Sequence, residues 1–152
     1  MARLNLEKAS PKGFAAVRRM EAHIRSTVDP ELLEFVKIRA SILNGCGFCI
    51  DMHTTEARSK GMAARRLHAV AGWQHAGELF EERERAVLAL TDAVTQISAD
   101  SVSDEVWGRV KQHFSDEEIG DLLVAIGTIN VWNRISIAAE VTPPVDAQHP
   151  VE

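Results

Sequence analysis

The segment from Ile119 to Ala139 most constrains how this chain can fold, because the helix that it predicts carries apolar side chains on nearly every face. A helix without a polar face has to be covered on all sides. A central helix within one domain meets this requirement, and so does a helix at an interface between identical subunits. Glycine and polar residues interrupt the segment, which indicates a buried helix and not a membrane span.

Helix signals follow one another along the rest of the chain, whereas alternating strand patterns are scarce. Asp29-Pro30 predicts a helix start, Asn44-Gly45 predicts a helix end, and Ser115 with Glu118 predicts a capping box. The expected helices cover residues 14–26, 30–44, 46–60, 62–70, 81–97, 103–113 and 115–140. The sequence therefore predicts an all-α fold, with one domain of about six to seven helices over residues 1–142. Residues 1–12 are expected to be irregular, and residues 143–152 to form a disordered tail.

The amino-acid composition indicates an ordinary globular protein. The 152 residues are 45% apolar and 26% charged, which is ordinary for a globular domain of this length. The net charge of −5 is interspersed, and the sequence has neither a basic stripe nor a basic amphipathic helix, so we expect no nucleic-acid or membrane partner. Residues 1–8 lack the apolar core of a signal peptide, which favours a cytoplasmic location. Cytosolic thiols are kept reduced, so a cysteine pair there is more often catalytic or metal-binding than structural.

The two cysteines of the chain, Cys46 and Cys49, are spaced Cys-x-x-Cys, and His53 follows four residues later. If a helix begins near Cys46, positions i, i+3 and i+7 lie on one face. Two thiols and an imidazole then converge on one patch, just after the helix end predicted at Asn44-Gly45.

The first interpretation of this patch is a redox-active dithiol. A thiolate is the reactive species, and it is favoured near a helix N-terminus and beside a protonatable histidine. His53 is placed to take the proton of Cys49, and the sulfenic acid formed on peroxide attack can condense with the second cysteine. Cys49 is the expected attacking thiol and Cys46 the more exposed resolving thiol. The reverse assignment stays open, because the leading cysteine at a helix tip is often the exposed nucleophile.

Two other interpretations compete with the dithiol. A zinc site could use Cys46, Cys49, His53 and a carboxylate, but structural zinc sites usually draw two ligand pairs from separate segments, and this chain has no second Cys/His pair. The cysteines could also be two small core residues beside a surface histidine.

Glu34, followed after eleven residues by Cys-x-x-Cys-x-x-x-His, resembles the signature of the alkylhydroperoxidase D-like (AhpD-like) group within the carboxymuconolactone decarboxylase superfamily. The likeness extends to residues 34–39, 80–90 and 132–135. It implies an all-helical fold that assembles as homo-oligomeric trimers or hexamers. It also implies a thiol-dependent peroxidase whose only redox group is the Cys46–Cys49 disulfide, with no metal and no further cofactor.

The resemblance also implies roles for four residues. Glu34 is the relay carboxylate, which helps His53, through water, to deprotonate Cys49, and Cys46 is the disulfide partner. Peroxide is the substrate, and a thiol reductant protein or a small dithiol restores the thiols. Gly47-Phe48 departs from the family, whose best-studied members have a histidine inside the Cys-x-x-Cys motif. The alternatives are a non-enzymatic thiol-disulfide redox sensor or exchange protein and, third, a metal-binding domain.

Other polar residues have expectations of their own. Asp51 and Glu56 are expected on the solvated side of the motif helix. Asn130, Asn133 and Arg134 interrupt the apolar helix, and buried polar groups need partners, so we expect them to hydrogen-bond between helices or between subunits. Four histidines are expected at the surface: His23, His68, His75 and His113.

Overall fold

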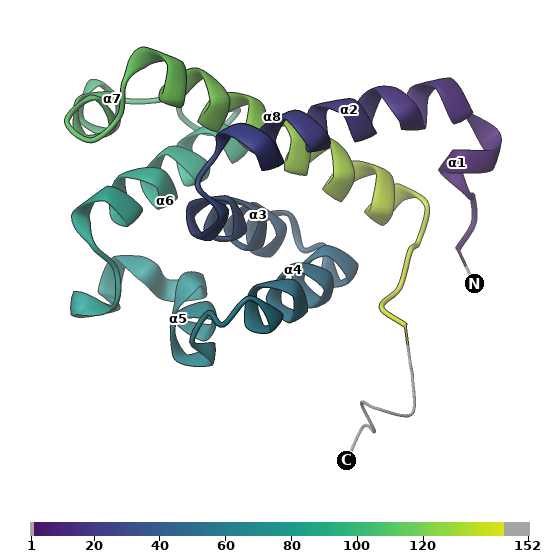
Figure 1. The fold of residues 1–152 in the computed structure, drawn as a ribbon, viewed down its shortest axis with the longest axis horizontal. Coiled ribbons are helices and arrows are strands. Elements are labelled where there is room, and N and C mark those ends of the chain that lie inside the picture. Colours follow the sequence, from purple (N-terminus) through teal and green to yellow (C-terminus); the bar gives the residue numbers. More distant parts are fainter. Residues whose placement is uncertain (1, 145–152) are drawn as a thin grey trace.

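The computed structural model describes residues 2–144, and in that range every regular element is helical. Helix α3 (Pro30–Asn44) is central, and α4 (Gly47–Ser59), α6 (Glu82–Thr95) and α8 (Asp116–Ala138) pack around it. Helix α2 (Pro11–Thr27) lies along α8 on the outer side (Figure 1). The remaining elements are α1 (Leu6–Ala9), α5 (Ala64–Ala69), α7 (Asp104–Lys111) and two short 3-10 turns at Val70–His75 and Gly77–Leu79. The predicted all-α fold is confirmed.

The helix boundaries that the sequence predicted near the cysteines are confirmed. The Asp29 carboxylate accepts hydrogen bonds from the backbone N–H groups of Glu31 and Leu32 and so caps α3, while Pro30 occupies the first helical position. Gly45 ends α3 with φ +71°, a left-handed conformation that strongly favours glycine. This turn redirects the chain into α4, so that α3 and α4 pack against each other.

The expectation of an irregular N-terminal segment over residues 1–12 holds for residues 2–5 but is wrong from Leu6 onward. The Asn5 side chain accepts a hydrogen bond from the Lys8 N–H and caps α1, and Pro11 opens α2. Proline ends a helix that precedes it but fits the first position of the next, which explains the error. Phe14 then packs edge-on against Trp132 of α8, with ring centroids 5.7 Å apart.

Helix α8 is covered mainly from within the chain, because α2, α3 and α6 all pack against it. Two apolar side chains on α8 stay open to solvent, Val124 at 37% and Ile137 at 46% exposure. Helices of the same chain therefore cover most of the apolar surface of α8, although the central helix of the fold is α3. No helix in residues 2–144 has both the length and the hydropathy needed to cross a bilayer. Of the tail expected at 143–152, residues 145–152 lie outside the described part of the chain.

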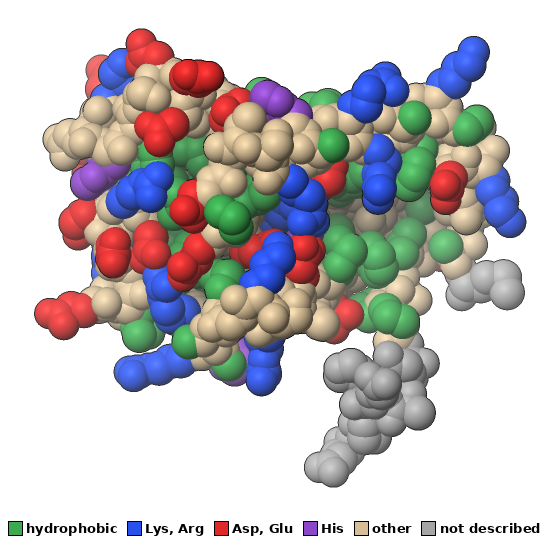
Figure 2. All heavy atoms as spheres, in the orientation of Figure 1, with side chains coloured by type: hydrophobic (Ala, Val, Ile, Leu, Met, Phe, Trp, Pro, Cys, Tyr) green, Lys and Arg blue, Asp and Glu red, His purple; other side chains and the backbone are tan. Residues whose placement is uncertain are grey.

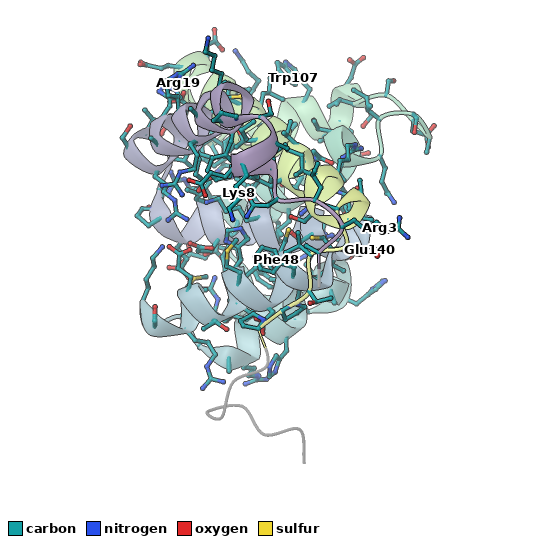
Figure 3. The ribbon with its side chains drawn as sticks, turned by 90° about the vertical axis from the view of Figure 1, so that its right-hand side faces the viewer. Arg3, Lys8, Arg19, Phe48, Trp107 and Glu140 are labelled. Atoms are coloured by element: carbon teal, nitrogen blue, oxygen red, sulfur yellow. The ribbon has the colours of Figure 1, made fainter. Side chains whose placement is uncertain are left out.

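The two ends of the described chain meet beside α8. The Arg3 N–H donates to the Ala139 carbonyl at 2.8 Å, and the Arg3 guanidinium contacts the Glu140 carboxylate at 2.5 Å. Figure 3 shows this pair on the same side of the molecule as Phe48 of α4. The N-terminal segment thus fixes the stretch that follows α8, which borders the dithiol.

Candidate active site

The cysteines lie at the start of α4, as the sequence predicted. Cys46 is the N-cap residue, and its sulfur accepts a hydrogen bond from the Cys49 N–H at 3.4 Å. Cys49 lies in the first turn of the helix. Both residues are free thiols, so the structure shows the reduced dithiol.

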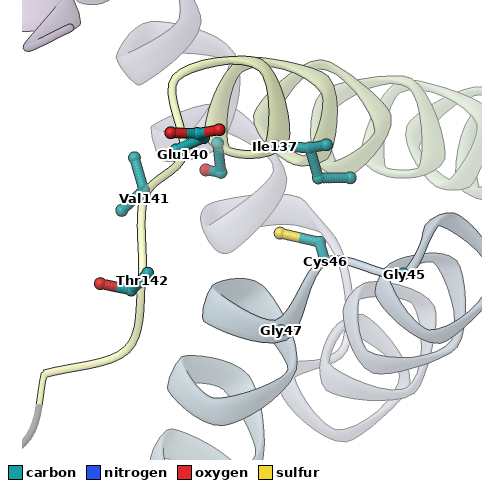
Figure 4. Close-up of a pocket in the computed structure, with 8 residues that line it drawn as sticks. Gly45, Cys46, Gly47, Ile137, Glu140, Val141 and Thr142 are labelled. Carbon is teal, nitrogen blue, oxygen red and sulfur yellow. The ribbon is translucent and has the colours of Figure 1, made fainter. Parts of the chain in front are cut away.

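Both thiols are buried, with Cys46 2% exposed and Cys49 1% exposed. The two exposures are nearly equal, so exposure does not distinguish Cys46 as the resolving thiol, and that assignment stays a prediction. The end of α8 covers Cys46, because Ser136, Ile137 and Glu140 lie over the turn that carries it (Figure 4). Only the tertiary arrangement places α8 there, since these residues are about 90 positions away in the sequence.

Burial also sets the protonation state of Cys49. Removal from water and the neighbouring Cys46 thiol raise the pKa of Cys49 to about 12, although the side chains of Asn133 and Ser136 act in the opposite direction. The raised pKa of Cys49 differs from the expectation that the helix N-terminus favours a thiolate there. Cys49 is a thiol at neutral pH, and its chemistry requires a base.

His53 and Glu34 form a buried pair behind Cys49. Glu34 comes from α3 and has no exposed surface, while His53 is one turn beyond Cys49 on α4 and 2% exposed. Nδ1 of His53 lies 3.3 Å from Oε2 of Glu34. The packing of α3 against α4 therefore brings together the glutamate and the histidine of the Glu…Cys-x-x-Cys-x-x-x-His pattern. The two atoms are within ion-pair distance but do not meet the geometry of a hydrogen bond.

Glu34 is ionised in this environment. Burial acts to raise its pKa, but His53 and Lys60 outweigh it, and the pKa of Glu34 lies below its ordinary value. Lys60 Nζ lies 2.9 Å from the second carboxylate oxygen. An ionised Glu34 favours the tautomer of neutral His53 with its hydrogen on Nδ1, which leaves Nε2 as the base.

Glu56 belongs to the same cluster, contrary to the expectation that it lies on the solvated side of α4. Its carboxylate is half-buried, 3.9 Å from Nδ1 of His53, and Arg25 of α2 binds it through both guanidinium nitrogens. The bond from Arg25 lowers the pKa of Glu56 to about 2. The i, i+3 spacing of His53 and Glu56 could have predicted that these two side chains lie close together. The sequence gives no local signal for the contact between Glu56 and Arg25 of α2. Asp51, by contrast, is exposed as expected.

Asn130 and Asn133 of α8 bond between helices, as predicted, whereas the exposed Arg134 bonds to Asn130 within α8, contrary to the prediction. The Asn44 side-chain amide donates to the amide oxygens of Asn130 and Asn133, and the Asn133 amide donates to Ser41 Oγ at 2.9 Å. This network joins α3 to α8 directly beside Cys49. The four histidines expected at the surface are exposed.

One group of side chains in the described residues has the spacing of metal ligands, with Glu34, His53 and Glu56 offering atoms within 4.8 Å of one another. This group includes neither cysteine, so the zinc set proposed from the sequence is not assembled. Lys60 contacts one oxygen of Glu34 and one of Glu56, and Arg25 binds Glu56, whereas Oε2 of Glu34 and Nδ1 of His53 have no hydrogen-bond partner among the described residues. Two positively charged side chains thus lie beside the group and would repel a further cation.

The two thiols border different cavities. Cys49 and His53 line a cavity of about 540 Å³ between α2, α4 and α8. Cys46 lines another, of about 400 Å³, together with Gly45, Gly47 and the stretch from Ser136 to Thr142 (Figure 4). Ser136 is the residue common to both linings. The dithiol therefore separates two spaces in the folded chain.

Comparison with known proteins identifies the family. Residues 9–93 match the model of the carboxymuconolactone decarboxylase family. The uncharacterized protein YdfG of Bacillus subtilis (strain 168) is 37% identical over 137 residues, which cover 90% of this chain and 92% of YdfG.

Solved structures agree with this assignment. A protein of unknown function from Agrobacterium tumefaciens, described as a candidate antioxidant defence protein AhpD, superposes with a TM-score of 0.92 at 39% identity, over 96% of this chain and all of that one. The debrominase Bmp8, in complex with 2,3,4-tribromopyrrole, shares the fold with a TM-score of 0.79 at 18% identity, over 92% of this chain and 74% of its own. Because the family model spans more than half of the residues, the chain belongs to the carboxymuconolactone decarboxylase family and to its AhpD-like group.

Proposed function

We propose that this protein is a thiol-dependent peroxidase that uses the Cys46–Cys49 dithiol. One observation carries the proposal: a buried, ionised Glu34 contacts His53 at 3.3 Å, and His53 borders the same cavity as Cys49. A thiol with a pKa of about 12 needs such a base to react at neutral pH. The likeness to a candidate antioxidant defence protein supports the same reaction class.

The reaction proceeds in three balanced steps. His53 Nε2 takes the Cys49 proton, the thiolate attacks the terminal peroxide oxygen, the O–O bond breaks and the alcohol leaves with the proton from His53. Cys49 is then a sulfenic acid, and the Cys46 thiol attacks its sulfur to form the disulfide and release water. An external dithiol reduces this disulfide and becomes oxidised itself, which restores both thiols.

Oxidation by peroxide and reduction by the external thiol take place on opposite sides of the dithiol, each in its own cavity. Peroxide reaches Cys49 through the cavity between α2, α4 and α8, and the thiol reductant attacks Cys46 from the cavity below the end of α8. The proposed reductant is a thiol protein or a small dithiol. Its attack forms a mixed disulfide on Cys46 and releases the Cys49 sulfur next to its base.

Steady-state peroxide consumption with a regenerating dithiol tests the proposal. Cys49→Ser and Cys46→Ser should each abolish turnover, and His53→Ala should slow it by about 100-fold or more. Undiminished turnover in Cys49→Ser would overturn the mechanism. A stoichiometric disulfide without turnover would instead identify the rival function, a redox sensor or exchange protein. A metal assay of the purified protein tests the third candidate, a metal-binding domain.

A further inference from the structure

The cavity at Cys49 is far larger than hydrogen peroxide requires. Its volume is about 540 Å³, whereas a water molecule takes up about 30 Å³ of the liquid and hydrogen peroxide is only slightly larger. Five apolar side chains form much of its lining: Phe14, Ala22, Phe48, Met52 and Trp132. A space of this size and character suits an organic molecule. In the space-filling view, hydrophobic side chains gather below α2, and Lys and Arg side chains line α2 above them (Figure 2).

Most charges near one end of this cavity compensate one another. Three carboxylates and three cations form a continuous chain of ion pairs between α2, α3 and α4, in the order Lys37–Glu21–Arg25–Glu56–Lys60–Glu34. The separations in this chain run from 2.5 to 2.9 Å. These six side chains carry no net charge together and offer little attraction to an ionic substrate.

Arg18 lines the same cavity but lies outside this chain. Among residues 2–144 it has no carboxylate within ion-pair distance, so its guanidinium adds an uncompensated positive charge to the cavity. A guanidinium beside an apolar space binds a carboxylate well, because it can donate two parallel hydrogen bonds.

Arg18 also lies at the level of the reactive thiol. Helices α2 and α4 run in the same direction (Figure 1) and are bridged by Arg25 and Glu56. Arg18 precedes Arg25 by seven residues, as Cys49 precedes Glu56, and seven residues correspond to about 10 Å of helix. The guanidinium and the thiol therefore border the same section of the cavity from opposite helices.

We propose that the cavity selects organic hydroperoxides that have an apolar body and a carboxylate. The body packs on the apolar lining, Arg18 binds the carboxylate, and the O–O bond reaches Cys49. The peroxide chemistry rests on the proposed peroxidase function and follows the balanced step given above. Arg18 is a specificity-determining residue in this account, since it contacts a part of the substrate that does not react.

A matched pair of substrates tests this inference: the hydroperoxide of linoleic acid and that of its methyl ester, both below their aggregation concentrations. Wild type should favour the acid in kcat/KM by about tenfold, which is the value of one charge-assisted hydrogen bond. Arg18→Ala should remove that preference through the KM of the acid, and Arg18→Lys should restore part of it. Arg19→Ala is the control, because Arg19 is an exposed arginine of α2 like Arg18 but does not line the cavity.

The outcomes separate this inference from the proposed function. Equal use of acid and ester by wild type, or an equal loss of both in Arg18→Ala, would overturn the role of Arg18 while leaving the peroxidase in place. Absence of turnover with either hydroperoxide would overturn the peroxidase. In that case, calorimetric binding of linoleate and methyl linoleate to Cys49→Ser would test the role of Arg18 independently of turnover. Tighter binding of linoleate, lost in Cys49→Ser/Arg18→Ala, supports it, and equal binding refutes it.

Discussion

Nδ1 of His53 lies 3.3 Å from Oε2 of Glu34, and both atoms are buried without a hydrogen-bond partner among the described residues. A buried polar atom without a partner is costly, so such a pair is expected where it serves a function. Here it joins the carboxylate of one helix to the base of the next. In the proposed mechanism, this contact allows His53 to deprotonate a buried thiol whose pKa is raised.

Replacing Glu34 by Gln should slow peroxide-dependent oxidation of Cys49 by about 10- to 100-fold, because the neutral amide no longer favours the hydrogen on Nδ1 of His53 or a charged imidazolium. Stopped-flow measurement of a single turnover would show the effect. Asp51→Asn, on the exposed side of α4, is the matched control and should oxidise at the wild-type rate. A wild-type rate in Glu34→Gln would remove Glu34 from the mechanism.

Filling each cavity in turn should separate the two half-reactions. Met52→Trp occupies the space next to Cys49 and should slow oxidation by peroxide at least tenfold while leaving re-reduction of the disulfide unaffected. Thr142→Trp occupies the space next to Cys46 and should do the reverse. Rapid-mixing experiments on the reduced and oxidised proteins measure the two rates. If either variant slowed both steps equally, the assignment of one side to each reactant would be wrong.

Alkylation of Cys49 should speed up continuously with pH. Burial and the Cys46 thiol raise its pKa to about 12, so the thiolate fraction rises about tenfold for each pH unit between 7 and 10. Iodoacetamide labelling, followed at Cys49 by tandem mass spectrometry, measures this slope. A plateau near pH 7 would mean that the thiol has a low pKa. Labelling in 6 M guanidinium chloride is the reference, since the unfolded thiol has its ordinary pKa and should level off above pH 9.

Asn133→Ala should destabilise the fold by about 1–3 kcal/mol, because it leaves the buried Ser41 hydroxyl without this partner and removes one of the two bonds of the half-buried Asn44 amide. Urea unfolding followed by circular dichroism measures the change. Asn5→Ala, which removes a cap from the exposed four-residue α1, is the comparison and should cost less. A loss in Asn133→Ala no greater than that in Asn5→Ala would show that the α3–α8 network contributes little to stability.

Low pH should weaken the link between α2 and α4. The bond from Arg25 lowers the pKa of Glu56 to about 2, below its unfolded value, so Glu56 stabilises the folded chain above that unfolded value and loses the effect as pH falls toward 2. Glu56→Gln should therefore be less stable than wild type at pH 6, and the difference should shrink between pH 5 and pH 2. Chemical unfolding across this range measures it. A difference independent of pH would mean that charge does not hold this pair together.

The local signals of the sequence predicted much of the fold. Asp29-Pro30 and Asn44-Gly45 fixed both ends of α3 because capping and left-handed glycine are properties of a few neighbouring residues. The same signals placed Cys46 at the N-cap of α4 and put Cys49 and His53 on one helix. The start of α2 at Pro11 is not predicted, since a proline marks a helix start as readily as a break.

The sequence by itself thus determined most of the helices and the spacing of the dithiol, and the family pattern singled out Glu34. Only the tertiary structure decided the burial of Cys46 under α8, the raised pKa of Cys49 and the recruitment of Glu56 by Arg25. These properties depend on side chains from helices far apart in the sequence, which remove water from the thiols and bring opposite charges together. Helix periodicity describes one element at a time, whereas solvation and charge are shared among elements, and no local pattern encodes them.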